Sequence, residues 1–385
     1  MPDSISEIGR GVFNNCSSIK SLRLPKGLKK IDDWNFQNCP SLETIWLPFG
    51  VKKETLPWKF RGKGKEMSLE DCGVWLDDKG VAYSSDKKEL IKGESSLTEY
   101  SILDGTEVIS DNAFNGCLRL KHISIPSSVQ EIKNGAFNIC GVEELILPNS
   151  IIKLGNSIFG GVNGFNPLEK IVIPPSVEEM DGNPFAGYAL KVYNESNHFM
   201  IINDVIYTSD LKKIISCLAV GKEILRIADI VKVIGKYAFA SCNLKEIIVP
   251  DSVEEIDEFA FYGSSLKAIS IPETISVINE GTFQRCGLKN VVLPQSIKEL
   301  KRRSFCDCFA LESITIPSSV ILIGDSAFGA CRSLEKVTIL GCNAKISISS
   351  FRYCDKLREI VVPKGCKERF VSMLSDNKFI IREDR

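Results

Sequence analysis

The sequence predicts an α/β solenoid, an array of short coils with a ladder of parallel β-strands on its concave face and short helical or 3₁₀ turns on the other. Three observations support this fold class. A phenylalanine recurs every 22 or 23 residues, a proline stands eleven residues before most of these phenylalanines, and a run of alternating apolar residues ends at each proline. Such short periods indicate that the 385 residues form one continuous repeat array rather than two or three domains.

The phenylalanine at the end of each return segment defines the repeat. Twelve copies are clear, and a worn copy that begins at Pro48 brings the number to about 13. The spacing widens to 26 residues where "GVNGFNP" follows Phe159. The Phe column consists of Phe13, Phe36, Phe114, Phe137, Phe159, Phe185, Phe239, Phe261, Phe283, Phe305, Phe328 and Phe351.

Each copy predicts one strand and one turn. In "LKHISIP", alternate residues point to one face of a short strand, and Pro126 ends it. In the return segment "SVQEIKNGAF", Val129, Ile132 and Phe137 are spaced so that a helical or 3₁₀ turn brings them to one side. The same strand returns in every coil, so the strands stack in parallel. Periods of about 20 to 29 residues with this apolar pattern indicate a leucine-rich-repeat solenoid.

Cysteine recurs as regularly as phenylalanine. Nine of the fourteen cysteines lie three residues after a member of the Phe column. This regularity predicts buried apolar thiols, each able to donate a hydrogen bond to a neighbouring backbone group, rather than disulfides or metal ligands. Neighbouring coils could bring two cysteine Cα atoms within bridging distance, so disulfides stay open. The Cys column consists of Cys16, Cys39, Cys117, Cys140, Cys242, Cys286, Cys308, Cys331 and Cys354.

Composition narrows the classes of function. The 48 basic and 49 acidic residues nearly cancel and form no long run of one sign, so the sequence predicts no nucleic-acid partner. No run of 18 apolar residues occurs, so we expect no transmembrane segment. The two histidines, His122 and His198, lie in no catalytic motif, and we expect neither an enzyme, a metal site nor a cofactor. Because carboxylates are numerous, a glycosidase with two of them as its catalytic acids remains an alternative.

The repeat unit IPxSVxxIGxxAFxxCxxLxxIxI resembles the Treponema pallidum type of leucine-rich repeat found in BspA-like proteins. The resemblance covers about residues 2–363 and is carried by the proline, phenylalanine, cysteine and strand positions. It implies a non-enzymatic protein-binding or adhesion module of a cell-surface or secreted protein, with a host or microbial surface protein as ligand. Two other functions stay open: a structural spacer that projects another domain, and a carbohydrate-binding protein with a glycan ligand. We expect a monomer.

Two stretches interrupt the repeat, and a tail follows it. "GVAYSSDKKELIKG" at Gly80 to Gly93 and "DVIYTSDLKKIISC" at Asp204 to Cys217 each have the pattern of a β-hairpin. The first residues already match the repeat, so we expect the natural array to extend before Met1. The predicted organisation is 1–56 N-terminal repeats, 57–99 degenerate repeat with a hairpin insertion, 100–193 central repeats, 194–223 second hairpin insertion, 224–363 C-terminal repeats and 364–385 C-terminal cap.

The tail after Pro363 reads as a short amphipathic helix with Phe370, Val371 and Leu374 on one face. A terminal coil needs its open apolar end covered, so we expect this segment to cap the array. A helix that docks a partner is the alternative.

Candidate binding residues lie between the inward apolar positions of the strands, on the concave sheet. Several are aliphatic and one is Trp46, so they could form a low-charge surface for another protein, with the tryptophan as anchor. The preference of pleated surfaces for β-branched residues is the alternative explanation. The candidates are Arg23, Thr44, Trp46, His122, Ser124, Ile146, Val172, Ile248, Val292, Thr315, Thr338 and Val361.

Overall fold

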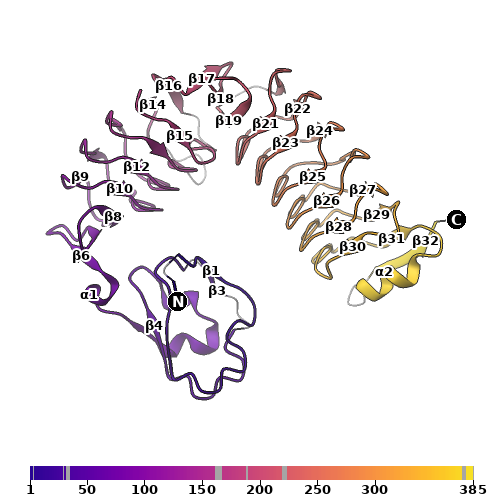
Figure 1. The fold of residues 1–385 in the computed structure, drawn as a ribbon, viewed down its shortest axis with the longest axis horizontal. Coiled ribbons are helices and arrows are strands. Elements are labelled where there is room, and N and C mark those ends of the chain that lie inside the picture. Colours follow the sequence, from indigo (N-terminus) through magenta and orange to yellow (C-terminus); the bar gives the residue numbers. More distant parts are fainter. Residues whose placement is uncertain are drawn as a thin grey trace. The chain divides into compact units, whose positions relative to one another are not determined.

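A computed structural model of the chain describes residues 1–2, 4–28, 30–31, 35–160, 167–187, 190–218, 223–374 and 379–384. These residues form two compact units, Met1–Glu94 and Ser95–Arg385. Both consist of short coils with parallel strands and little helix, which confirms the predicted solenoid (Figure 1). The insertion "GVNGFNP", apart from Pro167, lies outside the described residues.

The first unit contains two parallel sheets and one antiparallel meander. Strand β1 pairs with β3, β4 lies between β2 and β5, and β7 forms antiparallel pairs with β6 and β8, the second of which is the predicted hairpin. The rings of Phe13 and Phe36 stack in its core with centroids 5.3 Å apart. Its strands are β1 (Glu7–Ile8), β2 (Ser21–Arg23), β3 (Lys30–Ile31), β4 (Thr44–Leu47), β5 (Gly64–Glu66), β6 (Val74–Leu76), β7 (Ala82–Ser84) and β8 (Glu89–Lys92). Its helices are η1 (Lys53–Thr55), η2 (Trp58–Lys63) and α1 (Leu69–Cys72).

In the second unit, each regular coil contributes a longer strand that corresponds to the "LKHISIP" segment. Inward and outward residues alternate along these strands, as Ile171 and Ile173 are buried while Lys170 and Val172 are exposed. We call the surface made by the outward side chains at these strand positions the long-strand face, and we use the same name for the outward side chains of β2 and β4 within the first unit. The longer strands are β9 (Glu99–Ser101), β11 (His122–Ser124), β14 (Lys170–Ile173), β16 (Lys191–Asn194), β20 (Ile224–Arg226), β22 (Glu246–Ile248), β24 (Ala268–Ser270), β27 (Ser313–Ile316), β29 (Lys336–Ile339) and β31 (Glu359–Val362).

The return segments carry a second, shorter strand and a chain of tight turns. In one copy the N–H of Asn138 donates to the carbonyl of Gly135 three residues earlier, at 2.9 Å, as in a 3₁₀ turn. The next N–H, that of Ile139, donates instead to the carbonyl of Gly160 in the following coil, at 2.7 Å. The shorter strands are β10 (Val108–Ile109), β12 (Glu131–Ile132), β13 (Lys153–Leu154), β15 (Glu179–Met180), β21 (Val233–Ile234), β23 (Glu255–Ile256), β25 (Val277–Ile278), β26 (Glu299–Leu300), β28 (Leu322–Ile323) and β30 (Lys345–Ile346).

The Phe column forms a continuous ring stack through the C-terminal coils. Between Phe239 and Phe351, successive centroids are 5.2 to 5.5 Å apart and the rings are nearly parallel. The Cys column lies beside this stack. Its members are free thiols, and several donate to the carbonyl of a Phe in the preceding coil, as Cys331 does to Phe305 at 3.1 Å. The prediction of buried thiols bonded to the backbone is confirmed for Cys39, Cys140, Cys286, Cys308 and Cys331. Cys16 and Cys354 are only half-buried, and Cys242 donates to the sulfur of Cys217.

The second insertion forms three antiparallel strands, β17 (Phe199–Ile202), β18 (Val205–Thr208) and β19 (Lys213–Cys217). The last of them pairs in parallel with β21, so the insertion leads back into the ladder of short strands. The buried side chain of Asn183 joins the coils on either side: its amide donates to the carbonyl of Tyr237 at 3.2 Å, and its Oδ1 accepts from the hydroxyl of Ser216 at 2.6 Å.

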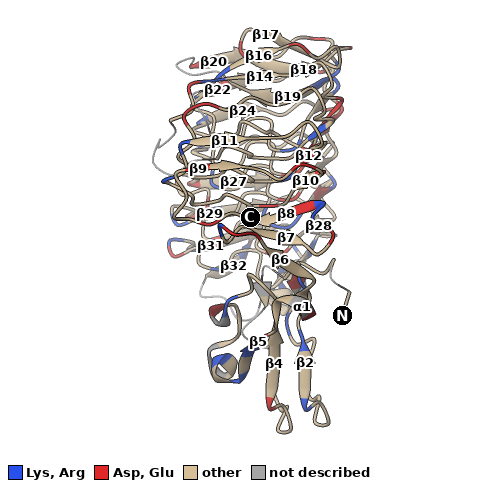
Figure 2. Ribbon diagram, turned by 90° about the vertical axis from the view of Figure 1, so that its left-hand side faces the viewer, with Lys and Arg blue, Asp and Glu red and all other residues tan. Residues whose placement is uncertain are grey.

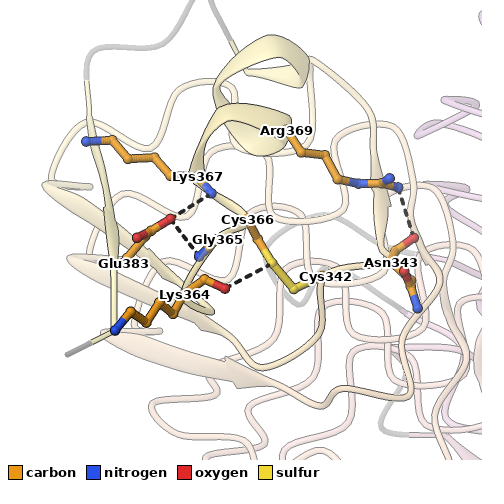
Figure 3. The surroundings of a disulfide bond; sticks show 8 residues. All are labelled: Cys342, Asn343, Lys364, Gly365, Cys366, Lys367, Arg369 and Glu383. Carbon is orange, nitrogen blue, oxygen red and sulfur yellow. Dashed lines mark hydrogen bonds between the residues drawn. A yellow bond between two sulfur atoms is a disulfide. The ribbon is translucent and has the colours of Figure 1, made fainter.

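The C-terminal tail closes the core of the second unit. Helix α2 (Lys367–Met373) buries Phe370, and β32 (Ile380–Glu383) adds a parallel strand beside β31. A disulfide joins Cys342 to Cys366 at the start of the helix, and the carboxylate of Glu383 accepts from the N–H of Gly365 at 2.9 Å (Figure 3). Leu374 is also buried, but Val371 is 43% exposed. The prediction that Val371 shares the buried face is wrong, because that face is made by Phe370 and Leu374, four residues apart.

Charged residues of both signs are interspersed along the coils (Figure 2). Many pair with the same position of the next coil: Lys232 lies 2.7 Å from Glu254, and Lys289 lies 3.2 Å from Glu312. These pairs are exposed, so each contributes at most about 1 kcal/mol to stability. The stack is therefore held mainly by its apolar core and its backbone hydrogen bonds.

Candidate functional site

Most of the twelve candidate binding residues lie on the long-strand face with exposed side chains. Ile146 is 75% exposed and Val292 is 80% exposed, far more than an aliphatic core residue. Thr44 and Thr338 are half-buried. The exposed members are Arg23, Trp46, His122, Ser124, Ile146, Val172, Ile248, Val292 and Thr315.

Val361 is the exception, since its side chain is only 6% exposed. The expectation that it faces a partner is wrong. The reason is the C-terminal tail: β32 pairs with β31 and places Arg382 opposite Val361, and the guanidinium of Arg382 reaches Glu359 at 2.7 Å. The last coil of the array is thus covered by its own cap.

Three of the candidates belong to the first unit. Trp46 on β4 lies in register between Arg23 on β2 and Lys65 on β5, and its indole is 39% exposed. A guanidinium nitrogen of Arg23 donates to the carbonyl of Asp71. The exposed tryptophan in this sheet is therefore flanked by two cationic residues.

Three candidates of the second unit line one groove. His122, Ile146 and Val172 surround an open groove of about 1250 Å³ on the long-strand face. This volume is larger than the roughly 300 to 1,000 Å³ of pockets for drug-sized molecules. The other lining residues are Glu143, Glu144, Leu145, Leu147, Asn149, Pro167, Glu169, Lys170, Ile171, Pro174, Tyr193 and Glu195.

The groove lies where the ladder of longer strands is interrupted. Residues 143–147 have the alternation of a strand, with Leu145 and Leu147 buried and Ile146 exposed. They form a single β-bridge, between Glu144 and His122 of β11, and among the described residues no pairing joins them to β14. The two-stranded sheets β9–β11 and β14–β16 therefore stand apart, with this segment between them.

The ring stack is wider at the same place. Centroids are 6.1 Å apart for Phe137 and Phe159 and 6.3 Å for Phe159 and Phe185, against 5.2 to 5.5 Å in the C-terminal coils. This is also where the repeat lengthens to 26 residues. The lengthened coil, the looser stack and the open ladder thus coincide.

Strand β14 turns an unpaired edge toward the groove. On its other edge, the N–H of Lys191 in β16 donates to the carbonyl of Glu169 at 3.0 Å. Successive residues of a parallel strand point their N–H and C=O groups to opposite sides, so those of Lys170 and Val172 face away from β16. In the part of the chain that the structure describes, no hydrogen bond joins these backbone groups to another strand.

The rim of the groove is acidic. Its lining includes four glutamates, Glu143, Glu144, Glu169 and Glu195, against the single cation Lys170. The Nζ of Lys121, just outside, lies 2.7 Å from Glu143, and its hydrogen bond lowers the pKa of that carboxyl. Glu143 is therefore held as a carboxylate at neutral pH.

Sequence reasoning missed Tyr193, which is 44% exposed and lies in register with Val172 on the neighbouring strand. It occurs in "LKVYNES", which lacks the proline that ends most of the other long strands and directly precedes the second insertion. The alternation of Leu190 and Val192 with outward residues was the signal that could have placed it on the long-strand face. Ile146, Val172 and Tyr193 thus form one apolar strip across the groove.

Other kinds of site find no support in the described residues. No group of three His, Cys, Asp or Glu side chains there is arranged to hold a metal ion. No helix within the same residues is long and apolar enough to cross a membrane. The groove is lined by apolar side chains, carboxylates and a strand edge.

Comparison with known proteins agrees with this architecture. The profile of the family described as "BspA type Leucine rich repeat region (6 copies)" matches residues 1–55, 88–212, 222–288 and 277–379. No curated protein matches the chain in sequence.

Two solved structures are similar in fold. A leucine-rich repeat protein from Eubacterium ventriosum is 21% identical, with a TM-score of 0.58 over 74% of this chain and 87% of its own. The pneumococcal vaccine antigen PcpA is 19% identical, with a TM-score of 0.53 over 79% of this chain and 84% of its own. At these identities the likeness shows the fold alone. The family profile, in contrast, matches most of the chain, and the protein belongs to the BspA-type leucine-rich repeat family.

Proposed function

We propose that this chain is a non-enzymatic protein-binding or adhesion module of a cell-surface or secreted protein, and that it binds through the long-strand face. One observation carries the proposal: His122, Ile146 and Val172, each a candidate from its strand position alone, surround one groove. Membership of a leucine-rich repeat family supports a binding role, since such solenoids present extended surfaces to partners.

The apolar content of the long-strand face supports a protein ligand. Scattered exposed aliphatic residues need no partner, but contiguous apolar patches mark interaction sites. Ile146, Val172 and Tyr193 form such a patch in one groove, and Trp46 offers an aromatic anchor on the first unit. A surface of this kind suits a protein with apolar side chains of its own.

The disulfide between Cys342 and Cys366 supports a location outside the cytoplasm. Disulfides persist in oxidising environments and are rare where thioredoxin and glutathione keep thiols reduced. A surface or secreted protein meets that condition.

The proposal can be tested with an array of purified secreted and cell-surface proteins, probed with the labelled chain. We expect at least one protein to bind, and Trp46→Ala or Ile248→Lys to weaken that binding at least tenfold, because both side chains are exposed on the long-strand face. The matched control is Ile321→Lys. Ile321 is 51% exposed but directly precedes the short strand β28, outside the long-strand face.

Three results would contradict the proposal. These are an array without any captured protein, a captured protein that binds both long-strand variants as well as the unchanged chain, and equal weakening by Ile321→Lys. Circular dichroism of each variant checks that the solenoid is folded.

A further inference from the structure

We propose that the groove accepts an extended segment of a partner protein as an added strand along β14, with the segment's apolar centre on Ile146, Val172 and Tyr193 and its Lys or Arg residues at the glutamates. The inference rests on the proposed function and deepens it, because it names the form and the chemistry of the partner's segment.

The backbone of β14 is ready to pair with another strand. The N–H and C=O groups of Lys170 and Val172 face the groove and have no partner strand among the described residues. Unpaired strand edges bind extended peptides through main-chain hydrogen bonds. The four residues of β14 span about 13 Å, enough for a segment of four or five residues.

The apolar strip crosses the unpaired edge of β14. Val172 is 41% exposed on β14, Tyr193 lies in register with it on β16, and Ile146 is 75% exposed on the opposite side of the groove. A bound segment would bury these side chains against its own apolar residues. Removing apolar surface from water would lower the free energy of the complex. Main-chain hydrogen bonds would thus hold the segment along β14, and the apolar strip would select segments with apolar residues at their centre.

The carboxylates lie toward the two ends of β14. Glu169 directly precedes β14, whereas the N–H of Glu195 donates to the carbonyl of Ile173 at the far end of β14, at 2.9 Å. Glu143 and Glu144 begin the segment on the opposite side of the groove. Glu143 is paired with Lys121, and against the other three glutamates the lining holds only Lys170, so the complementary segment carries cations at both ends of an apolar centre.

A second coil shows why exposure alone does not make this site. Val292 is 80% exposed at the same strand position as Ile146, but it forms β-bridges to Ser270 on one side and to Thr315 on the other. The ladder is closed there, and no strand can be added beside it. An exposed aliphatic side chain is therefore not enough to make such a site.

The test uses the full chain and a fluorescein-labelled peptide, Lys-Arg-Val-Ile-Val-Lys-Arg amide, with fluorescence anisotropy as the readout. Two control peptides accompany it: one has glutamate in place of all four cations, and the other has N-methyl groups on its three central amides. We expect the first peptide to bind with a micromolar Kd and both controls to bind at least tenfold more weakly. Reversed charge would repel the glutamates, and N-methylation would block the main-chain bonds.

The protein variants are Ile146→Lys and Ile321→Lys, both at exposed positions where folding is expected to persist. We expect Ile146→Lys to weaken binding of the basic peptide at least tenfold. Ile321→Lys, outside the long-strand face, should change it less than twofold. Raising the salt concentration should weaken binding, because it screens the glutamates.

The inference is overturned if the basic peptide does not bind, if the N-methylated peptide binds equally well, or if Ile321→Lys weakens binding as much as Ile146→Lys. These outcomes are separate from failure of the proposed function. Suppose that a protein captured on the array no longer binds the Ile248→Lys chain but still binds the Ile146→Lys chain. The long-strand face then binds proteins, but not through the groove.

Discussion

The thiol of Cys308 donates a hydrogen bond of 3.0 Å to the main-chain carbonyl of Phe283 in the preceding coil. The same relationship joins Cys286 to Phe261, Cys331 to Phe305 and Cys354 to Phe328. Each of these four cysteines thus links two coils beside the ring stack. Substitution of these cysteines therefore measures how much the hydrogen bonds between coils contribute to stability.

Replacing Cys308 with alanine should lower the free energy of unfolding by about 1–2 kcal/mol. The side chain is fully buried, so the change removes the thiol's hydrogen bond and leaves a small cavity. The Phe283 carbonyl keeps the N–H of Cys286 as a donor at 3.1 Å, which limits the loss. Urea unfolding measures the effect. Cys306→Ala, at a half-buried position two residues away, is the control and should change stability by less than about 0.5 kcal/mol; an equal loss in both variants would contradict the assignment.

The buried thiols should also make the protein less stable in alkali. Burial raises the pKa of Cys286 from 9.0 to about 12, so the folded state holds this proton more tightly than the unfolded state. Stability from the neutral thiol is complete below pH 9 and is lost as the pH rises toward 12. The unchanged chain should have a higher free energy of unfolding than Cys286→Ala. This difference should be about 2 kcal/mol smaller at pH 10.5 than at pH 8.

Urea titrations at the two pH values provide that measurement. Val292→Ala serves as control, since it alters an exposed residue that does not titrate, and its effect on stability should be the same at both pH values. A Cys286→Ala effect that is also independent of pH would show that the thiol is not held neutral by the fold.

Gly281 should tolerate no side chain, for two separable reasons. Its φ of +60° disfavours residues with a Cβ, and a Cβ there would lie 2.2 Å from the ring of Phe259. Gly281→Ala should therefore lower the free energy of unfolding by about 3 kcal/mol. Gly105→Ala, at a φ of +86° with nothing within 4 Å of the new Cβ, carries only the backbone cost of about 1 kcal/mol.

A double variant separates the ring from the backbone. In a Phe259→Ala background, Gly281→Ala should cost no more than Gly105→Ala does, because the opposing ring is gone. Chemical unfolding of the four chains gives the coupling between Gly281 and Phe259. If Gly281→Ala costs the same with and without the ring, contact with Phe259 is not the reason for glycine.

Removing the disulfide with the double variant Cys342→Ala and Cys366→Ala should lower the free energy of unfolding by about 3 kcal/mol. The bond spans 24 residues and attaches the C-terminal tail to the last coils, so its loss frees the unfolded chain and loosens the cap. Alkylation of the denatured, unreduced protein should modify the 12 free cysteines, as read by mass spectrometry. A reductant should destabilise the unchanged chain and leave the double variant unaffected; modification of all fourteen would refute the bond.

Much of the coil could be predicted because its rules are local and repeated. A phenylalanine recurs at nearly the same spacing in successive copies. The place of Phe137 in the ring stack therefore follows from that spacing. The column position of Cys308 likewise predicted burial and a backbone partner. Val361 and Val371 could not be predicted in the same way, because the tail that covers the first and exposes the second lies outside the repeat.

The sequence by itself determined the solenoid, the stacked Phe and Cys columns, and which strand residues point outward, because each of these follows from a period that every copy repeats. Only the tertiary structure decided where the ladder opens, that Tyr193 joins Ile146 and Val172 beside an unpaired strand edge, and that Cys342 meets Cys366. These features depend on how far apart two neighbouring coils lie and on what the non-repeating segments cover. Contacts between residues of different coils set both, and no single repeat contains that information.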